Sequence, residues 1–596
     1  MHIEKQLIQA LQQAFQERFD VAMPLSVLTL QPTHSGFEGD YTFVTFPWAG
    51  RCQQRPDEVA QQLGEWLKAH STVVADFNVV KGFLNLTLDD PVWSEQLTAM
   101  EHADYFGALP ANGKKVVIEF SSPNTNKPLH LGHLRNIFLG DAVARILEAA
   151  GHSVYRVNLV NDRGIHVCKS MVAYQKFGQG ETPETSGIKG DHLVGNYYVK
   201  FEQIYKEQVA ALTKQWGDSE RAAQEAPILR EAQQMLQMWE QGDKTVRALW
   251  HTMNHWVYEG FATTYQQLGI TFDKTYYESA TYLRGKRIVE EGLSKAIFYT
   301  KKDGSVWADL TAEGLDHKLV LRADGTSVYI TQDLGVADLR YRHYHFDRSI
   351  YVVGNEQDYH FEVLFKLMRQ LGRDYAKDMV HLSYGMVDLP TGKMKSREGT
   401  VVDADQLIEE MGVIVSQRTQ QLGKVADFSD QEAYQLHHTL AMGALKYFLL
   451  RVEASKRILF DPQASIDLQG HTGPYIQYTY ARIAAVLRKA QSAGLDCRGS
   501  GWDESLFFQP VERAVMIFLT QFPKKLQEAA AAYSPAIMAQ YVFELAKAYN
   551  RLYAEVAILS AESPASQQLR LSLSVTVARA IQCGMHLLGI HVPERM

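Results

Sequence analysis

Apolar and polar residues follow a helical period at the start of the chain. Ile3, Leu7, Leu11, Phe15 and Phe19 recur every four positions, with Gln, Glu and Lys between them. This spacing predicts an amphipathic helix that buries one stripe of side chains. Because the segment has no continuous apolar stretch, we expect no secretory leader.

Residues 1–108 are expected to form one α+β unit. A strand is predicted near 41–46 and a helix at 57–69, and the leucines within 77–88 alternate with polar residues as in a half-buried strand. Residues 108–115 are rich in Pro, Gly and Asn, which predicts a linker.

A strand–helix–strand pattern begins after this linker. Residues 116–120 (VVIEF) are a short apolar run, as expected for a parallel strand covered on both faces. A polar loop, a helix that ends at Gly151 and a second buried-type strand at 154–160 follow. This order predicts the βαβ unit of a doubly wound sheet.

The same pattern returns later in the chain. Strands are predicted at 327–331, 349–354 and 379–389, and helices from about 333 and near 360–371. Two such halves predict one nucleotide-binding sheet that is interrupted by a large, mostly helical insertion.

Beyond residue 403 helical patterns dominate, including helices at 475–490 and 544–559. A helical bundle is expected from about 460 to the end. The expected segments are an α+β domain, a sheet domain in two pieces, the insertion, a helical connector and the bundle, at 1–108, 109–180 with 320–402, 181–319, 403–459 and 460–596.

Composition limits the possible classes of protein. With 596 residues, about three to five domains are expected. Lys and Arg number 60 against 68 Asp and Glu, so binding of a polyanion would require a local basic surface. The four cysteines contain no CxxC, which disfavours disulfides and a structural zinc site. No apolar run approaches a membrane span, so we expect a cytoplasmic protein.

The most informative motif joins the first loop to its helix. His130 and His133 lie three residues apart, on one face of a helix N-terminus that suits phosphate binding. Gly132 leaves room for a flat ring, and Lys127 adds a point charge. Two ordinary exposed histidines are the alternative, and a metal site lacks further ligands at a suitable spacing. Phosphate chemistry on ATP fits best.

A second motif follows the last predicted strand of the sheet. Lys393, Lys395 and Arg397 place three cations within a glycine-flanked stretch that also contains Met394. Such a basic loop could close over a triphosphate and neutralise the leaving pyrophosphate. A solvated hairpin tip is the alternative.

Together the two motifs resemble the HIGH and KMSKS signatures of the class I aminoacyl-tRNA synthetases. The segments 118–136, 329–333 and 471–483, the glutamine of GNEQDYH and the ending LLGIHVPERM narrow the resemblance to arginyl-tRNA synthetases. This resemblance implies a multidomain α/β fold. It consists of a split Rossmann-like parallel-sheet catalytic domain with a helical insertion, an N-terminal α+β domain and a C-terminal all-α bundle.

The resemblance also implies an arginine pocket. The matching positions are Glu119, Asn124, Tyr329, Asp333 and Gln357. Carboxylates suit a planar guanidinium, and a tyrosine ring or hydroxyl can meet the same cation. The alternative is that the two acids are strand-end charges that face water.

One position departs from the family pattern. Lys393 and Met394 match the KMSKS register, but Ser396 stands where the second lysine belongs. The family is thought to compensate with the lysine before HIGH, here Lys127. Lys395 or Arg397 could share that task, so the cation that meets the phosphates stays open.

The two ends of the chain resemble tRNA-handling domains. The N-terminal unit is implied to contact the tRNA elbow, and the C-terminal bundle to bind the anticodon. Tyr475, Tyr549, Tyr553 and Asn550 are candidates to stack on and hydrogen-bond with bases. Packing of each tyrosine in a helical core is the alternative.

The expected activity is ligation of L-arginine to tRNA(Arg) through arginyl-adenylate, with ATP and accompanying Mg²⁺. The resemblance further implies that tRNA binds before the adenylate forms. We expect a monomer with no membrane partner. The rival functions are a small nucleotidylyltransferase, which would be shorter; a class I synthetase for another amino acid; and a non-catalytic tRNA-binding paralogue, which would have lost the histidines or acids.

Overall fold

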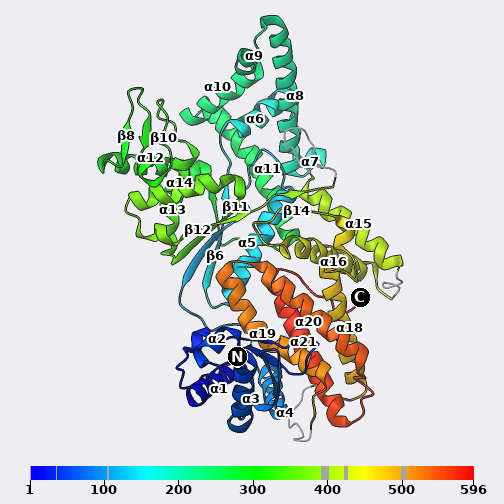
Figure 1. Cartoon of the computed structure of the whole chain (residues 1–596). Helices are drawn as coiled ribbons and strands as arrows, with labels where there is room; N and C mark the ends of the chain where they lie inside the picture. Colours follow the sequence, from blue (N-terminus) through cyan, green and yellow to red (C-terminus); the bar gives the residue numbers. More distant parts are fainter. Residues whose placement is uncertain (1, 35, 104–105, 391–401, 422–426, 498–505) are drawn as a thin grey trace. The chain divides into compact units, whose positions relative to one another are not determined.

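A computed structural model of the chain describes residues 2–34, 36–103, 106–390, 402–421, 427–497 and 506–596 (Figure 1). The chain divides into two compact units. The first comprises Met1–Leu109, Asp467–Ala532 and Ile537–Met596, and the second comprises Pro110–Ile466 and Tyr533–Ala536. Within the described ranges, no helix combines the length and apolar character needed to cross a bilayer.

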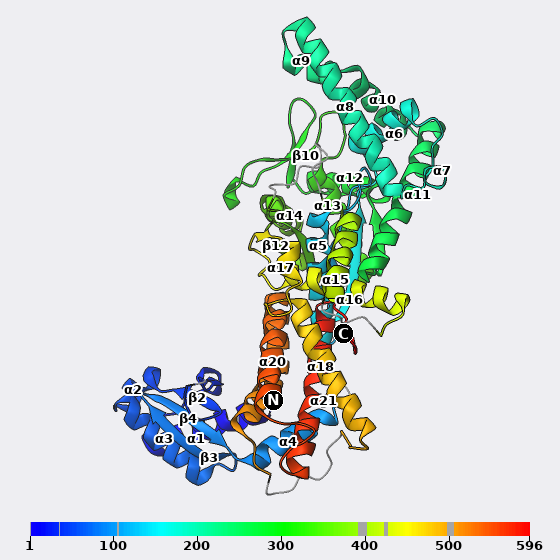
Figure 2. The ribbon, with the colours of Figure 1, turned by 90° about the vertical axis from the view of Figure 1, so that its right-hand side faces the viewer.

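The amino-terminal part of the first unit is a four-stranded antiparallel sheet, in the order β1-β2-β4-β3, that packs on helices (Figure 2). Its elements are α1 (His2–Phe19), η1 (Leu25–Val27), β1 (Leu30–Pro32), β2 (Tyr41–Val44), α2 (Phe46–Cys52), α3 (Pro56–His70), β3 (Val74–Val80), β4 (Phe83–Leu88) and α4 (Asp90–Glu101). The predicted opening helix is confirmed, and Ile3, Leu7, Leu11 and Phe15 of its apolar stripe are buried. The predicted helix at 57–69 is confirmed as α3.

The half-buried strand expected from the leucines within 77–88 is confirmed as β4, but residues 77–80 belong to a second strand, β3, and the two strands meet in a hairpin. Lys81 and Gly82 form the connection with φ of +48° and +75°. A two-residue hairpin needs left-handed residues at its tip, and the Lys-Gly pair supplies them. The period of the leucines gave no sign of this reversal.

The carboxyl-terminal part of the first unit is helical. It comprises α18 (Gly473–Ser492), α19 (Pro510–Ala532), α20 (Pro535–Glu555) and α21 (Pro564–Leu587). Within it, the buried guanidinium of Arg570 binds Glu512 and Glu562 at 2.7 Å each, which ties α21 to α19 and to the turn before α21. The helices predicted at 475–490 and 544–559 are confirmed as α18 and α20, although α20 ends at Glu555.

The second unit is built on the predicted parallel sheet, which is confirmed. Five strands pair in parallel in the order β12-β11-β5-β6-β7. The strands and their helices on this sheet are β5 (Lys115–Glu119), α5 (Leu131–Ala149), β6 (Ser153–Val160), β7 (Lys274–Tyr277), β11 (Arg348–Gly354), η3 (Asn355–Gln357), α14 (Asp358–Gln370), η4 (Asp374–Asp378) and β12 (Met379–Tyr384).

Alternation along the strands gives the sheet two apolar faces. Val117, Val157 and Tyr351 belong to a core with α12, α13 and α14. Val116 and Ile118 point to the opposite face, since successive side chains of a strand alternate, and α5 contacts the sheet. Burial on both faces explains why these strands are continuous apolar runs in the sequence.

The segment between β6 and β7 is helical, and it leads into β7, the edge strand of the sheet. It contains α6 (Ile165–Phe177), α7 (Pro183–Ser186), α8 (Gly190–Trp216), α9 (Ser219–Glu225), α10 (Pro227–Gln241) and α11 (Lys244–Leu268), which group together at the top of Figure 1. The edge strand β7 lies inside the segment predicted as insertion at 181–319. Its sequence, KTYY, is too short to have been recognised as a strand.

Between β7 and β11 the chain forms α12 (Glu278–Ser294), β8 (Phe298–Thr300), β9 (Val306–Ala308), η2 (Thr311–Glu313), β10 (Lys318–Leu321) and α13 (Tyr329–Tyr344). The strand predicted at 327–331 is wrong, because α13 begins within it. Two glycines explain the helix: a Cβ on Gly335 would lie 2.6 Å from the backbone nitrogen of Gly285 on α12. This close helix–helix contact outweighs the strand preference of Val328, Tyr329 and Ile330.

The second unit ends with helices that follow the sheet. These elements are β13 (Val387–Asp388), α15 (Ala404–Gln421), α16 (Asp430–Leu450), β14 (Ile458–Leu459) and α17 (Pro462–Ser465). The guanidinium of buried Arg135 on α5 donates to the carbonyls of Gly385 and Leu449 at 3.1 and 2.7 Å, so α5 is tied to both segments.

We predict that Gly335→Ala destabilises the protein by about 1–3 kcal/mol, because the added methyl group has no space between α12 and α13. Thermal unfolding followed by circular dichroism measures the effect. Gly412→Ala on α15 is the matched control, since nothing lies within 4 Å of its added Cβ. The control should be neutral or stabilising by up to about 1 kcal/mol. Equal melting temperatures for both variants would contradict the close packing.

Candidate active site

The sheet reverses its strand order beside β5. From β5 the chain adds β6 on one side and β11 on the other, so the carboxyl ends of β5 and β11 lie side by side at a topological switch point. Ligands of open α/β sheets bind at such a switch point. Glu119 ends β5, and Gln357 lies exposed in η3 directly after β11.

The loop that leaves β5 has an unusual backbone. Ser121 and Ser122 both have positive φ, +72° and +44°. Side chains from neighbouring elements hold this conformation: Asn136 on α5 accepts from the Ser121 nitrogen at 2.5 Å, and Asn158 on β6 accepts from the Ser122 nitrogen at 3.0 Å. Non-glycine residues in this region cost energy and cluster at functional sites.

His130 and His133, the histidine pair, cap the N-terminus of α5. His130 Nδ1 accepts from the Gly132 nitrogen and His133 Nδ1 accepts from the His130 nitrogen, each at 3.1 Å. The ring centroids are 3.9 Å apart. Because both Nδ1 atoms are acceptors, each neutral ring carries its proton on Nε2.

The histidines are neutral over the physiological range. Burial, helped by Lys127, lowers the pKa of His130 to about 3. Burial, His130 and Lys127 lower the pKa of His133 well below 6.5. The pair therefore offers two Nε2–H donors without positive charge, and Lys127 is the cation beside them. A Cβ on Gly132 would lie 3.0 Å from His130 Cε1, so glycine here also leaves room for the His130 ring. That it leaves room for a flat ring of the ligand stays a prediction.

The predicted arginine-binding residue Glu119 already holds an arginine of the chain. Its carboxylate pairs with the buried guanidinium of Arg340 on α13 and accepts from Ser122 Oγ at 3.1 Å. The rings of Tyr276 and Tyr351 lie 5.3 and 5.5 Å from the Arg340 guanidinium carbon. This end of the site thus pairs a guanidinium with one carboxylate and places it near two aromatic rings.

Asp333 and Tyr329 lie on the first turns of α13. Asp333 Oδ2 is 2.6 Å from His360 Nε2 on α14. Burial raises the pKa of Tyr351 to about 12, and the charges of Glu119 and Asp333 add to this shift, so both acids act electrostatically on one ring. The hypothesis that Asp333 ends a strand is wrong, because Asp333 lies on α13. Tyr329 is 64% exposed.

The structure adds a third acid, Glu278, that the sequence analysis missed. It is the first residue of α12, is 8% exposed and faces Asp333 and Arg163. Burial, together with the Asp333 carboxylate, raises its pKa to about 8. Glu119, Glu278 and Asp333 are called the acid cluster below. A perturbed carboxyl in a crevice is a functional signal, but it depends on contacts that a single sequence does not reveal.

Along the loop that leaves β5, Asn124 lies between Glu119 and the histidine pair. Asn124 and Asn161 pair as neighbouring backbone segments beyond the end of β6. With its amide nitrogen turned toward the acid, Asn161 lies 2.7 Å from Glu278 Oε2. The loop and the start of α12 are therefore linked at this point.

Four predicted residues, Lys393, Met394, Lys395 and Arg397, lie outside the described residues. In the described ranges one group has the spacing of a metal site: Asp191, His192 and Asp405. The ammonium of Lys189 already lies 2.5 Å from Asp405 and 3.2 Å from Asp191. Since the lysine supplies the positive charge, this group does not fit a divalent cation.

Three of the four residues predicted to contact tRNA form one cluster in the first unit. Asn550 Nδ2 donates to Tyr475 Oη at 3.0 Å, and Arg482 Nη1 donates to Asn550 Oδ1 at 2.5 Å. The Arg482 guanidinium lies 5.0 Å from the ring of Tyr553, which is 43% exposed. Tyr549 corrects the expectation, because it is fully buried and hydrogen-bonded to Ser574.

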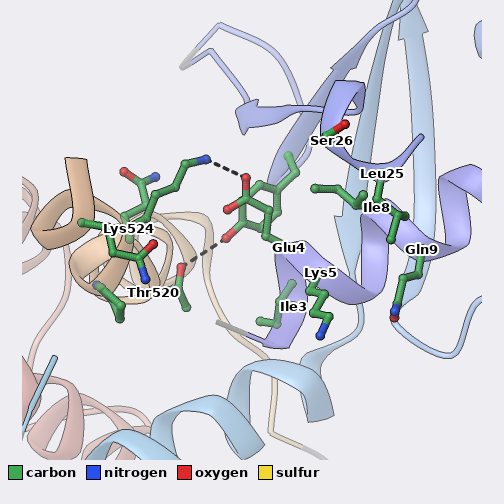
Figure 3. Close-up of a pocket in the computed structure, with 13 residues that line it drawn as sticks. Ile3, Glu4, Lys5, Ile8, Gln9, Leu25, Ser26, Thr520 and Lys524 are labelled. Atoms are coloured by element: carbon green, nitrogen blue, oxygen red, sulfur yellow. Dashed lines mark hydrogen bonds and ion pairs between the residues drawn. The ribbon is translucent and has the colours of Figure 1, made fainter. Parts of the chain in front are cut away.

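The first unit also contains a hollow of about 480 Å³ between α1 and α19 (Figure 3). Its lining is largely apolar, from Ile3, Ile8 and Leu25, and an ion pair of 2.7 Å joins Glu4 and Lys524 across it. None of the residues that line it is a histidine.

Comparison with known proteins agrees with this geometry. The family described as "tRNA synthetases class I (R), catalytic domain" matches residues 97–461, which include the histidine pair and the acid cluster. The fold and the site therefore define a class I aminoacyl-tRNA synthetase.

The ends of the chain identify the family within that class. Residues 1–88 match the "Arginyl tRNA synthetase N terminal domain" and 476–596 match the "DALR anticodon binding domain". Arginine–tRNA ligases of Amoebophilus asiaticus and Bacteroides fragilis are 62% and 50% identical over the full length of both chains. The arginyl-tRNA synthetase of Thermus thermophilus superimposes with a TM-score of 0.79 at 25% identity over 100% of both chains. The chain belongs to the arginyl-tRNA synthetase family.

We predict that the stability of Glu278→Gln, measured relative to the wild type, increases as the pH rises from 5 to 8. The folded protein keeps a proton on Glu278 up to about pH 8, whereas the unfolded chain loses it near 4.5, so the wild type loses stability across this window. Glutamine cannot ionise, so the variant escapes this loss. Chemical denaturation at both pH values measures the difference.

Glu290→Gln is the control for this measurement, because Glu290 is exposed on the same helix. The pH-dependent gain in stability of Glu278→Gln should exceed that of this control. A Glu278→Gln variant whose gain does not exceed that of the control would show that Glu278 is ionised in the folded protein.

Proposed function

We propose that the chain is an arginine–tRNA ligase, which joins L-arginine to the 3′-terminal adenosine of tRNA(Arg) at the expense of ATP. Full-length relatives of this activity support the assignment. The observation that carries the choice of amino acid is the acid cluster, which gathers three acidic side chains beside the switch point and already holds one guanidinium, that of Arg340.

The acid cluster and its neighbouring residues are proposed to bind the arginine substrate. Asp333 offers a carboxylate that the chain has not paired with a buried arginine, so it suits the guanidinium of the substrate. Glu278, which holds a proton in the folded protein, would ionise beside that incoming cation. Tyr329, exposed on the same helix as Asp333, can cover that cation. Asn124 and Gln357 supply neutral polar groups at the rim, where the α-amino group of arginine would need partners.

Activation joins the arginine carboxylate to the α-phosphate of ATP. The carboxylate attacks in line, the bond between the α- and β-phosphates breaks, and pyrophosphate leaves. The Nε2–H groups of the histidine pair donate to phosphate oxygens, and Lys127 neutralises charge that develops there. Gly132 and the helix N-terminus hold these donors in place. Lys393, Met394, Lys395 and Arg397 are proposed to act on the triphosphate from the second motif.

Mg²⁺ is proposed to arrive with the phosphates of ATP. The one metal-like group among the described residues holds Lys189, so no protein cage for the ion is assigned. The ion would supply further charge neutralisation on the phosphates.

Transfer places the arginyl group on the terminal ribose of tRNA, at the 2′-OH that class I enzymes use. Tyr475, Asn550 and Tyr553 are proposed to contact bases, with Arg482 stacked beside Tyr553. Tyr549 has no such role because it is buried. That tRNA must bind before activation, and that the chain acts as a monomer, remain predictions.

Two other functions are disfavoured. A synthetase for another amino acid would have no use for three carboxylates around a site for a cation. A non-catalytic tRNA-binding paralogue would have no use for a capped histidine pair with both donors intact.

Charging of total tRNA with each of the twenty amino acids tests the assignment. We expect product with arginine alone, and none with citrulline, a neutral isostere that leaves the carboxylates unpaired. Asp333→Asn should raise the KM for arginine about 100-fold or more while the KM for ATP stays unchanged. Efficient charging with another amino acid and none with arginine would refute the function.

Replacement of His133 tests the proposed chemistry. His133→Ala removes one Nε2–H donor, so arginine-dependent pyrophosphate exchange should fall about 100-fold or more while tRNA affinity is kept. His133→Asn retains an acceptor for the helix cap and is the control for local unfolding. If both variants lose tRNA binding, the histidine is structural.

A further inference from the structure

The segment at the start of α15 is paired with the histidine motif. The Leu131 nitrogen donates to the Val402 carbonyl at 3.1 Å, and the Ala404 nitrogen donates to the Leu129 carbonyl at 3.0 Å. His130 and Asp403 form the antiparallel bridge between these two bonds. Residues 402–404 therefore form backbone hydrogen bonds on both sides of His130, the residue that caps α5, and are called the bridging segment below.

The next residue, Asp405, forms an ion pair and hydrogen bonds with residues of the insertion. Its carboxylate is 2.5 Å from Lys189 Nζ, 2.9 Å from His192 Nε2 and 2.9 Å from Thr264 Oγ1. Lys189 and His192 stand at the start of α8, and Thr264 stands on α11. Lys189 also donates to Thr264 Oγ1 at 2.6 Å, so these four residues form one connected group, called the insertion junction.

The same helix also reaches the other end of the motif. A Cβ on Gly195 of α8 would lie 2.8 Å from Cδ of Pro128 and 3.7 Å from Cα of Lys127. The backbone of α8 thus contacts the residues before the histidine pair, while the insertion junction binds Asp405, which follows the bridging segment. Helix α8 therefore contacts the motif both directly and through the bridging segment.

The junction is electrostatically well formed. Burial opposes ionisation of Asp405, but hydrogen bonds from His192 and Lys189 lower its pKa to about 2. Asp405 is therefore a carboxylate at any physiological pH, and Lys189 is its principal cation. A charge-assisted, partly buried pair fixes geometry better than an exposed one.

We propose that Lys189 and Asp405 are positioning residues of the reaction: they lock the segment at 402–405 to the insertion and thereby hold His130 and His133 in the orientation that meets ATP. This inference rests on the proposed function. It also assigns a task to the helical insertion, which braces the nucleotide end of the site. Displacement of reacting groups by about 1 Å can cost about 100-fold in rate.

Lys189→Met and Asp405→Asn test the proposal. Each should lower kcat for arginine-dependent pyrophosphate exchange about 10- to 100-fold, while the KM for arginine and the affinity for tRNA change less than about threefold. The double variant should be no slower than the worse single variant, because both changes break one link. Additive losses would overturn the proposal.

Lys169→Met is the matched control. Lys169 pairs with Glu202 at 2.7 Å in the same insertion, with similarly low exposure, but this pair lies outside the junction. If the control variant loses as much kcat as the junction variants at equal loss of melting temperature, the junction is merely structural and the proposal fails. Wild-type protein that exchanges pyrophosphate with no arginine dependence would refute the proposed function instead.

His192 supplies an independent pH readout. The hydrogen bond to Asp405, opposed by burial and helped by the charge of Asp403, raises the pKa of His192; Lys189 and Asp191 also face it. Its charge thus supports the junction at low pH and is lost as the pH rises through this raised value. The ratio of wild-type to His192→Gln kcat should be larger at pH 6 than at pH 8. A ratio independent of pH would contradict the coupling of the junction to catalysis.

Discussion

The buried ion pair between Glu119 and Arg340 is the constraint on which the site depends. A guanidinium without solvent must have a partner, and this one finds it at the carboxyl end of β5. Because Arg340 and Asp333 lie about two turns apart on α13, the pair also fixes where Asp333 stands relative to the sheet. Removal of either partner would leave a buried charge and free the helix that carries the pocket.

At the histidine pair, backbone hydrogen bonds rather than an ion pair orient the side chains. Both Nδ1 atoms accept hydrogen bonds from the backbone at the start of α5, so both Nε2–H groups stay available as donors. The histidines therefore contribute hydrogen bonds to phosphate, and charge is left to Lys127. Separation of these tasks keeps the donors fixed when the pH changes, because burial holds both rings neutral.

The sequence predicted the elements with strong local signals. The strands at 116–120 and 349–354 and the helix after His130 follow from apolar runs and from the Pro-Leu-His start. Prediction failed where a distant contact decides. The segment 327–331 has the composition of a strand, yet it is the start of a helix because Gly285 and Gly335 let two helices touch. Glu278 is an ordinary helix-start glutamate until α13 brings Asp333 beside it.

The insertion shows why such contacts matter more than sequence distance. Lys189 and Asp405 are separated by most of the catalytic domain, and neither lies in a recognisable motif, yet their side chains meet at 2.5 Å beside the histidine motif. A site assembled from widely spaced segments needs connections that tolerate little movement. Buried or half-buried charge pairs serve this purpose at both ends of the site, because each is costly to break. The chemistry is thus carried by short motifs, and its geometry by the residues between them.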